Sequence, residues 1–449
     1  MTAHLPFPPA SGGRRREFEL ISRLAIDFDV HLCSLTETPE IDNRNAGKLM
    51  DYCKHISIFK TGPSPLANGT SRYSSLLRRY YSREGFDGIS KLIRSPGFDI
   101  IHIEGSYLMQ LIPENCPVPI LLVEHNVEYS LYLQRLRLST SESDRSFYHQ
   151  EYDNTLLWER LFWKRAQKVI SLTPEDERHI RDLEPSANVT FIPNGVDHYL
   201  TIDRANAYSP SNGKTGPASV HFTPSTIENC HPILFVGNFA YDPNVDAAIF
   251  LCREILPLVV EKVPNAKLFI VGNSPPSELL DLVSSNNSST DRSTDTSEED
   301  KPDANTIHDH IEITGYVDSL EPFYKYAKVV VCPLRVGGGV KVKILEALRA
   351  GKAIVTTPIG AQGFGLNNEA LCVCSLVSDF ANNVVRFLIN PYERKRQERR
   401  ALRFANTLPT WDQVIEQYLS CYESLVSKTL TKNINIGHNS IQHRSTLFN

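Results

Sequence analysis

Short apolar runs rich in β-branched residues recur along all 449 residues of the chain, each followed by a polar turn and a longer amphipathic stretch. Runs that are apolar on both faces are typical of parallel strands buried beneath helices. The stretches between them repeat with a helical period, as Ala248, Cys252 and Ile255 do. We therefore predict an α/β fold in which helices cover parallel sheets. The predicted strands are residues 30–35, 55–59, 100–103, 120–123, 169–172, 189–192, 233–236, 268–271, 311–314, 329–332, 354–356 and 371–374.

The pattern falls into two blocks, and the chain is too long for one hydrophobic core. Segment 204–230 is rich in Ser, Pro, Asn, Thr and Gly and has no periodicity, so it is predicted to be a linker. Each block predicts a doubly wound, Rossmann-like domain, and the two domains are expected to face each other across a cleft. The predicted organisation is an N-terminal domain over 1–203, the linker over 204–230, a C-terminal domain over 231–390 with a disordered polar insertion at 284–305, helices over 391–428 that break at Pro409 and cross back to the first domain, and a disordered tail over 429–449.

The beginning of the first domain departs from this pattern. A βαβ domain should open with a strand, but only Met1–Pro6 precedes the turn at residues 7–13. Either the first strand is a stub or the recorded start lies downstream of the true one. We favour the second interpretation because the helix predicted from Arg14 needs a strand before it.

Composition excludes several classes of protein. No apolar run reaches the ~20 residues that span a bilayer, and the start lacks the order of a signal peptide. The nine cysteines are an odd number, most lie in apolar runs, and none has the spacing of zinc ligands, which predicts buried free thiols in a reducing compartment and no metal site. A net charge of −5 argues against nucleic acid as a partner. A cytoplasmic protein is the expectation.

A basic segment with aromatic residues, 76–94, departs from the overall charge balance. A solvated helix face is one interpretation. The other is a peripheral contact with anionic lipid at the inner face of a membrane.

The densest functional signal follows the predicted strand that ends at Cys332. Three glycines, Gly337–Gly339, form a loop, and a helix is predicted to begin near Val340. The N–H groups of such a loop and of the first helical turn, together with the positive end of the helix dipole, favour a diphosphate.

Side chains around this loop match the same ligand. Arg335 and Lys343 can neutralise phosphate charge, and Glu346 can accept hydrogen bonds from ribose hydroxyls. Lys343 and Glu346 are three residues apart and therefore share a helix face. The alternative is a structural glycine turn followed by a charged helix, but this alternative does not explain why two cations lie at the carboxyl end of a strand.

Two further motifs lie at the ends of predicted strands in the first block. Gly12 and Gly13 form a turn just before a helix, where phosphate can approach closely, although a plain tight turn is the alternative. His125, in Glu124-His125-Asn126, follows a predicted strand and could donate to a phosphate or a sugar hydroxyl, or be a structural histidine. Glu104 also follows a predicted strand, but the evidence that it contacts a ligand is weaker.

Together these motifs resemble those of the retaining glycosyltransferases of the GT-B fold, family 4. The resemblance covers nearly the whole chain outside the insertions. It rests on segments in the family's order, namely residues 6–13, Ser171-Leu172-Thr173, Ile192-Pro193-Asn194-Gly195-Val196-Asp197, Phe235-Val236-Gly237-Asn238, Leu268-Phe269-Ile270-Val271-Gly272, Ile313-Thr314-Gly315-Tyr316-Val317 and Leu345-Glu346-Ala347.

The resemblance implies a donor site for a nucleoside diphosphate sugar, which is a co-substrate, with no resident cofactor and no metal. It implies that His125, Arg335 and Lys343 are catalytic and that the donor is bound by Gly12, Gly13, Gly237, Asn238, Gly338, Gly339 and Glu346. The acceptor would be a carbohydrate or a lipid-linked sugar, as in polysaccharide or glycolipid synthesis.

Two departures from the family are visible. Relatives carry a pair of glutamates separated by seven residues, but the position eight before Glu346 is Gly338. The Arg and Lys that many members place after the first strand of the second domain are absent, and Pro-Asn-Val-Asp follows that strand in residues 243–246. We interpret Arg335 and Lys343 as the relocated cations, as in one branch of the family.

The sequence thus predicts transfer of a sugar from a nucleoside diphosphate sugar to an acceptor hydroxyl, with the anomeric configuration retained. Helix N–H groups and the two cations can stabilise the leaving diphosphate without metal. The alternatives are a nucleotide-sugar epimerase of the same fold and a non-catalytic nucleotide-sugar-binding protein. The donor sugar, the nucleotide, the acceptor and the oligomeric state are not readable from the sequence.

Overall fold

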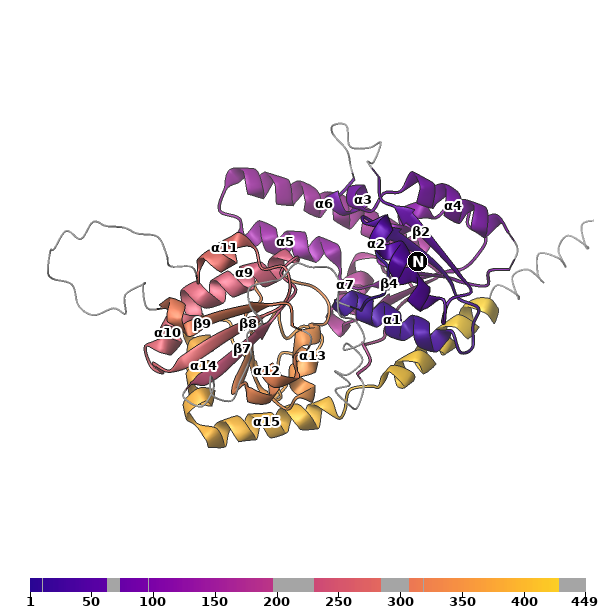
Figure 1. Cartoon of the computed structure of the whole chain (residues 1–449). Coiled ribbons are helices and arrows are strands. Elements are labelled where there is room, and N and C mark those ends of the chain that lie inside the picture. The colour runs from indigo at the N-terminus through magenta and orange to yellow at the C-terminus, as the bar shows by residue number, and fades with distance from the viewer. Residues whose placement is uncertain are drawn as a thin grey trace, which may run out of the picture. The chain divides into compact units, whose positions relative to one another are not determined.

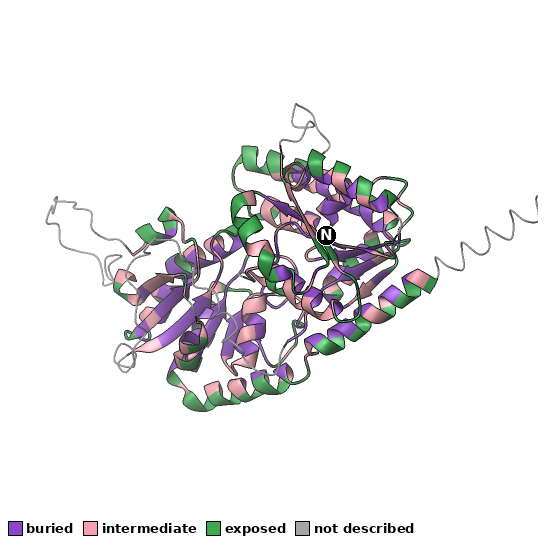
Figure 2. Ribbon diagram, turned by 45° about the vertical axis from the view of Figure 1, so that its right-hand side comes forward, coloured by how far each residue is buried: buried purple, intermediate pink, exposed green. Residues whose placement is uncertain are grey.

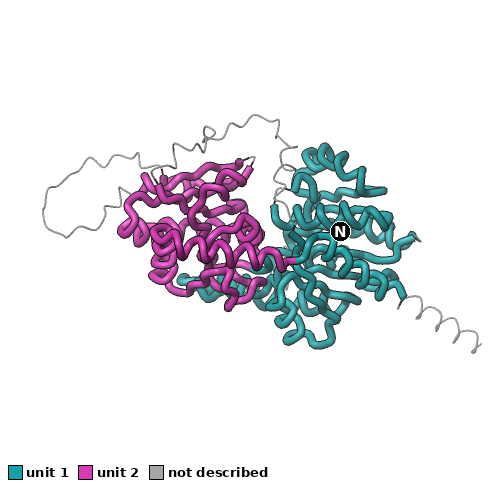
Figure 3. Tube along the Cα trace, turned by 90° about the horizontal axis from the view of Figure 1, so that it is seen from below, with its two compact units in different colours: residues 1–196, 338–340, 409–449 teal, residues 197–337, 341–408 magenta. Residues whose placement is uncertain are grey.

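The computed structural model describes residues 1–9, 11–62, 73–95, 97–196, 230–283, 307–317 and 319–427 (Figure 1). The predicted linker apart from Cys230, the predicted insertion and the predicted tail lie outside these residues. Chain contacts divide the protein into two compact units (Figure 3). Unit 1 consists of residues 1–196, 338–340 and 409–449, and unit 2 of residues 197–337 and 341–408.

Unit 2 contains a six-stranded parallel sheet with the order β12-β11-β10-β7-β8-β9. In chain order this is the arrangement 3-2-1-4-5-6 of a Rossmann sheet read from the other edge, with its switch point between β7 and β10. The strands are β7 (His231–Val236), β8 (Ala266–Val271), β9 (Ile311–Gly315), β10 (Val329–Cys332), β11 (Ala353–Thr356) and β12 (Cys372–Val373).

Helices cover both faces of this sheet. Helices α10 and α14 pack together on one face, and α13 and α15 pack together on the other (Figure 1). The helices of unit 2 are α9 (Asp242–Phe250), the π-helical turn Leu251–Ile255, α10 (Leu256–Val260), α11 (Ser277–Asp281), the 3-10 helix Ile307–His310, α12 (Glu321–Tyr326), α13 (Val342–Arg349), α14 (Val377–Ile389) and α15 (Pro391–Ala405).

Unit 1 has two parallel sheets, β1-β2 and β3-β4-β5-β6, joined by the first residues of the chain. The N–H of Thr2 donates to Cys33 O of β1 (3.0 Å), and Glu104 N of β3 donates to Met1 O (3.0 Å). Met1 and Thr2 therefore occupy the position of a first strand in a Rossmann order whose switch point lies beside β3. The strands are β1 (His31–Thr36), β2 (His55–Lys60), β3 (Ile101–Glu104), β4 (Ile120–Glu124), β5 (Lys168–Ser171) and β6 (Val189–Phe191).

Helices of unit 1 follow its strands in the alternation of a doubly wound fold. They are α1 (Gly12–Leu24), α2 (Pro39–Ala46), the 3-10 helix Gly47–Leu49, α3 (Ser75–Arg79), α4 (Arg83–Arg94), the 3-10 helix Ser106–Leu111, α5 (Glu128–Leu138), α6 (Glu142–Arg165) and α7 (Pro174–Leu183). Residues 411–427 are also helical.

That last helix packs into unit 1. Trp411, Val414 and Tyr418 are buried in one apolar cluster with side chains of α1, β4 and β5. Gly195 allows the close approach, because a Cβ at this position would lie 2.6 Å from the Cα of Trp411. The helix is separated from α15 by residues 406–410, which include Pro409.

All twelve predicted strands are present, with bounds that differ from the prediction by at most two residues at either end. The side chains of the central strands β4, β10 and β11 are buried on both faces, as expected for parallel strands under helices, whereas those of β2 and β12 are only partly buried or exposed (Figure 2). The predicted α/β fold with two Rossmann-like units is therefore confirmed.

Two predicted helix starts were displaced. Helix α1 begins at Gly12, two residues before the predicted start, because the Ser11 hydroxyl caps it by accepting from Arg14 N. The predicted Gly12-Gly13 turn is thus the first turn of a helix. Helix α13 begins at Val342, two residues later than predicted.

The basic segment 76–94 forms most of α3 and all of α4. Three of its arginines are paired with carboxylates: Arg78 with Glu151 (3.2 Å), Arg79 with Glu37 (3.0 Å) and Arg83 with Asp87 (3.0 Å). These pairs reduce the charge that the segment can offer to an anionic surface. No helix in the described ranges is both long and apolar enough to cross a membrane.

All nine cysteines are free thiols. In the part of the chain that the structure describes, no three His, Cys, Asp or Glu side chains converge in the manner of metal ligands.

Candidate functional site

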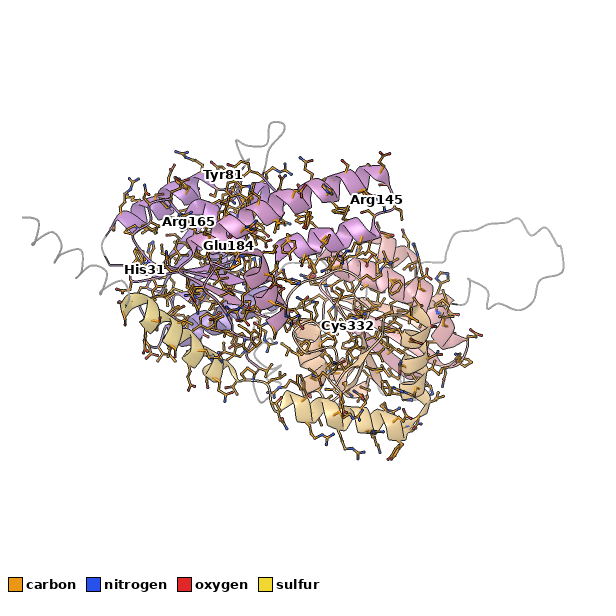
Figure 4. All side chains as sticks on the ribbon, turned by 180° about the vertical axis from the view of Figure 1, so that it is seen from behind. His31, Tyr81, Arg145, Arg165, Glu184 and Cys332 are labelled. Carbon is orange, nitrogen blue, oxygen red and sulfur yellow. The ribbon has the colours of Figure 1, made fainter. Side chains whose placement is uncertain are left out.

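The carboxyl ends of β7 and β10, at the switch point of unit 2, bring together the predicted donor-binding residues of that unit. Gly237 follows β7, and Arg335 follows Cys332, the last residue of β10 (labelled in Figure 4). Lys343 and Glu346 lie on α13, the helix that follows β10. In doubly wound sheets ligands bind outside the strand ends at this point.

Lys343 is half-buried, and its ammonium nitrogen lies 4.4 Å from the centre of the Phe235 ring. It donates a hydrogen bond to Asn244 Oδ1 at 2.7 Å. Burial lowers the pKa of Lys343, although Cys332 and Glu346 act in the opposite direction. A phosphate at this nitrogen would replace lost solvation and stabilise the charged form.

Arg335 is held by Asp246 on α9. Its Nε and Nη2 donate to the two carboxylate oxygens at 3.1 and 2.5 Å, and its guanidinium lies 4.6 Å from the centre of the Phe250 ring. A bidentate pair with a carboxylate has the geometry that a phosphate also requires.

Glu346 accepts a hydrogen bond from the hydroxyl of Tyr324 at 3.0 Å. The same hydroxyl is 3.3 Å from the carbonyl oxygen of Lys343. Tyr324 is buried on α12, so it fixes the orientation of the Glu346 carboxylate. Such a fixed carboxylate suits the recognition of a pair of hydroxyl groups.

Gly237 and Gly272 make the backbones at the ends of β7 and β8 meet. Gly272 has φ +151°, and a Cβ on it would lie 1.6 Å from the carbonyl oxygen of Gly237. Asn238, the next predicted residue, accepts on its carbonyl oxygen from Asn244 Nδ2 at 2.8 Å. The predicted donor residues of unit 2 therefore form one connected set.

His125, in unit 1, lies at the carboxyl end of β4 and its Nε2 contacts Glu104 Oε2. The other oxygen of Glu104 is 2.7 Å from His102 Nε2, and His102 Nδ1 is 2.5 Å from the Tyr422 hydroxyl. Burial opposes the charged form of His125, but the hydrogen bond and the charge of Glu104 raise the pKa of His125 overall. His125 is thus a group poised to donate a proton or a hydrogen bond.

Arg16 of α1 stabilises this cluster from the other side. It is 2 % exposed, donates to Asn194 Oδ1 (2.8 Å) and to the Tyr418 hydroxyl, and its Nε is 3.6 Å from Glu104. Burial alone would raise the pKa of Glu104, but Arg16 and both histidines hold it well below its usual range. Glu104 is therefore a carboxylate at neutral pH.

Three of the remaining predicted glycines lie close to His125 or Asn126. A Cβ on Gly13 would lie 3.6 Å from His125 Nδ1, whereas Gly12 is the first residue of α1. Gly338–Val340 belong to unit 1: a Cβ on Gly339 (φ +60°) would lie 2.2 Å from the carbonyl oxygen of His125, and one on Gly338 would lie 2.8 Å from Asn126 Cβ. A glutamate at position 338 does not fit without displacing its neighbours, which gives a steric reason for the absence of the first family glutamate.

Sequence reasoning missed Arg16, Tyr324, Asn244 and Asp246. Arg16 is the last of three consecutive arginines after the Gly12-Gly13 motif, and nothing in the sequence distinguishes it from the other two, whereas Tyr324 lies in a helix with no motif around it. The Pro-Asn-Val-Asp segment stands in the sequence where many relatives have cations, and its Asp246 and Asn244 side chains bind Arg335 and Lys343.

Two Rossmann-type units, one of which carries two cationic side chains at its switch point, have the architecture of the GT-B glycosyltransferases. Residues 231–390 match the family model described as glycosyl transferases group 1, and residues 10–199 match the one described as glycosyltransferase family 4. The chain is a glycosyltransferase of group 1.

Three known proteins illustrate the relationship. An uncharacterized 44.6 kDa protein in the cps region of Klebsiella pneumoniae is 23 % identical over 399 residues, which cover 86 % of this chain and 89 % of that protein. HepE of Anabaena in complex with UDP and glucose has a TM-score of 0.61 and 12 % identity, covering 94 % of this chain and 98 % of HepE. WaaG, a glycosyltransferase involved in lipopolysaccharide biosynthesis, has a TM-score of 0.59 and 14 % identity, covering 93 % of this chain and 97 % of WaaG.

Proposed function

We propose that this glycosyltransferase moves a sugar from a nucleoside diphosphate sugar to an acceptor hydroxyl, with retention of the anomeric configuration and without metal. The observation that carries the proposal is the joint position of Arg335, Lys343 and Glu346 at the switch point of unit 2. The two cations suit a diphosphate, and the fixed carboxylate suits ribose hydroxyls.

In this proposal the chemical step depends on charge stabilisation. As the bond between the sugar and the diphosphate breaks, negative charge develops on the leaving oxygen, and Arg335 and Lys343 stabilise it. His125, whose pKa is raised by Glu104, donates a hydrogen bond to the diphosphate or the sugar. Gly12, Gly13, Gly237, Asn238, Gly338 and Gly339 allow close approach of the donor.

A uridine diphosphate sugar is the first donor to test, since HepE was crystallised with UDP and glucose. The acceptor is proposed to be a carbohydrate or a lipid-linked sugar of a surface polysaccharide, in line with the role of WaaG and the cps location of the Klebsiella pneumoniae relative. A cytoplasmic location, with a peripheral membrane contact through segment 76–94, completes the proposal. Flotation of the protein with anionic but not neutral liposomes tests that contact.

A thermal-shift screen with nucleoside diphosphate sugars tests donor binding. A ligand at 100 times its Kd stabilises the folded state by about 2.7 kcal/mol. Product analysis with donor and acceptor then measures transfer and its stereochemistry. Turnover that survives both Lys343→Ala and Glu346→Ala would show that the donor site lies elsewhere.

A further inference from the structure

Helix α9 presents two side chains, Asn244 and Asp246, to the two cations of the proposed donor site. Asn244 contacts Lys343 and Asp246 contacts Arg335, although 99 and 89 residues separate the partners in the sequence. The two partners have the same shape but differ in charge, since one is an amide and the other a carboxylate. The two cations are therefore held in different electrostatic states.

Asn244 is locked in one orientation. It is 8 % exposed, its Nδ2 donates to the carbonyl oxygen of Asn238 (2.8 Å), and its main-chain N donates to that of Tyr241 (2.9 Å). Gly237 lets it pack against the end of β7, because a Cβ there would lie 3.1 Å from Asn244 Cγ. Because the side-chain amide nitrogen of Asn244 is already hydrogen-bonded, its amide oxygen is the atom that accepts from Lys343 Nζ, at 2.7 Å.

Lys343 consequently has a fixed position, and among the described residues no carboxylate forms an ion pair with it in direct contact. Its ammonium contacts the amide oxygen of Asn244 and the ring of Phe235, while the Glu346 carboxylate, which is bonded to Tyr324, acts on its charge without an ion-pair contact. A neutral acceptor orients an ammonium but leaves its charge available to a ligand.

Arg335, in contrast, is paired directly with a carboxylate. Both of its hydrogen bonds to Asp246 use the Nε–Nη2 edge of the guanidinium, one of the two edges that can bind a phosphate in bidentate fashion, and the ring of Phe250 lies against one of its faces. Its side chain is 39 % exposed and that of Asp246 is 19 % exposed. The pair is thus near enough to solvent for partners to be exchanged.

We propose that Asn244 and Asp246 are positioning residues that set the charge of the donor-phosphate site. Asn244 holds Lys343 as the anchor for the diphosphate, and Asp246 is an internal carboxylate that competes with the diphosphate for Arg335. The inference rests on the proposed function, because it assumes that the diphosphate binds at these two cations. Asp246 then weakens binding of UDP and favours its release after transfer.

Two substitutions of matched size test the proposal. Asp246→Asn removes a carboxylate beside Arg335, and Asn244→Asp adds one beside Lys343. We expect Asp246→Asn to lower the Kd for UDP by roughly 3- to 10-fold, and Asn244→Asp to raise it by about 10-fold or more, in line with partly exposed charge pairs. Calorimetric titration with UDP at roughly 50 and 200 mM salt measures both changes, and screening at the higher salt concentration should reduce them.

The opposite signs separate charge from general damage. A local disruption of the site would weaken binding in both variants, and such a result overturns the proposal, as does a Kd that changes by less than about 2-fold in both. If Asn244→Asp does not fold, as judged by circular dichroism, the sign of the Asp246→Asn effect decides, because tighter binding supports internal competition and weaker or unchanged binding contradicts it. The proposed function itself would be overturned if the unaltered protein bound neither UDP nor any other nucleoside diphosphate. If the unaltered protein binds UDP but neither substitution changes the Kd, only this inference is overturned.

Discussion

Glu104 and His125, 21 residues apart in the sequence, form an ion pair at the carboxyl ends of two adjacent strands of unit 1. The carboxylate is also bound by His102 and lies near Arg16, so it is charged and fixed in place. His125 is thereby kept protonated to a higher pH than a free histidine. Glu104 thus influences the charge of His125 without itself having to contact the substrate.

Replacement Glu104→Gln is expected to lower the pKa of His125, because the neutral amide does not stabilise the imidazolium. The pKa of His125 is raised in the folded protein, so its stabilising contribution is present at low pH and is lost as pH rises through that pKa. NMR titration of the His125 ring measures the change. Asp153→Asn, which removes the partner of the exposed His149, is the matched control and should leave His125 unaffected. An unchanged His125 titration in Glu104→Gln would refute the coupling.

Glu124 predicts a dependence of stability on pH in the same direction. Burial raises the pKa of its carboxyl to about 8, although hydrogen bonds from Trp163 Nε1 (2.6 Å) and Ser106 act against the shift. An acid with a raised pKa stabilises the fold in its protonated form, so the contribution is present at low pH and is lost as pH rises from the unfolded value of about 4.3 through about 8.

The substitution Glu124→Gln imitates the protonated acid. We expect it to change the unfolding free energy little at pH 5 and to stabilise the protein relative to the unaltered chain at pH 9. Urea unfolding at both pH values measures this difference. A constant difference between pH 5 and pH 9 would mean that Glu124 is not protonated in the folded state.

Gly195→Ala tests the packing of the C-terminal helix on unit 1. The new Cβ would lie 2.6 Å from Trp411 Cα and 2.7 Å from Trp411 N, and backbone atoms cannot move aside as a flexible side chain can. Overpacking of this kind costs about 1–3 kcal/mol. Urea unfolding followed by tryptophan fluorescence provides the measurement. Gly62→Ala, where a Cβ meets nothing within 4 Å, is the control and should be near neutral.

The thiols give a chemical test of the burial pattern. Burial raises the pKa of Cys53 to about 11 and that of Cys252 to about 12, so both remain protonated at pH 8. With Ellman's reagent we expect nine thiols in the denatured protein and far slower reaction of these two in the native one. Mass mapping after brief labelling identifies which cysteines react. Rapid labelling of Cys53 or Cys252 in the folded protein would contradict their buried positions.

The local pattern of the sequence was sufficient for the strands and for the fold. β10 was predicted with its observed bounds, Val329–Cys332, because an apolar run between polar turns has few alternatives in a parallel sheet. Helix starts were less accurate, as at α1, where the Ser11 hydroxyl brought Gly12 and Gly13 into the helix. Single hydrogen bonds determine such boundaries, and periodicity does not reveal them.

The predicted site residues could be chosen from the sequence because cations, glycines and a histidine at the ends of strands are poorly explained by packing. Their partners could not be chosen in the same way. Asp246 and Asn244 meet Arg335 and Lys343 only because the parallel sheet places β7 beside β10, and Tyr324 reaches Glu346 from a different helix.

The sequence by itself thus determined the alternation of strands and helices, the two Rossmann-like units and the positions where charged groups follow strands, since these depend on neighbours along the chain. The tertiary structure alone decided that Arg335 pairs with a carboxylate whereas Lys343 contacts an amide, and that Glu104 raises the pKa of His125. Charge states depend on distance and burial, and both are set by segments that are brought together only when the sheets form.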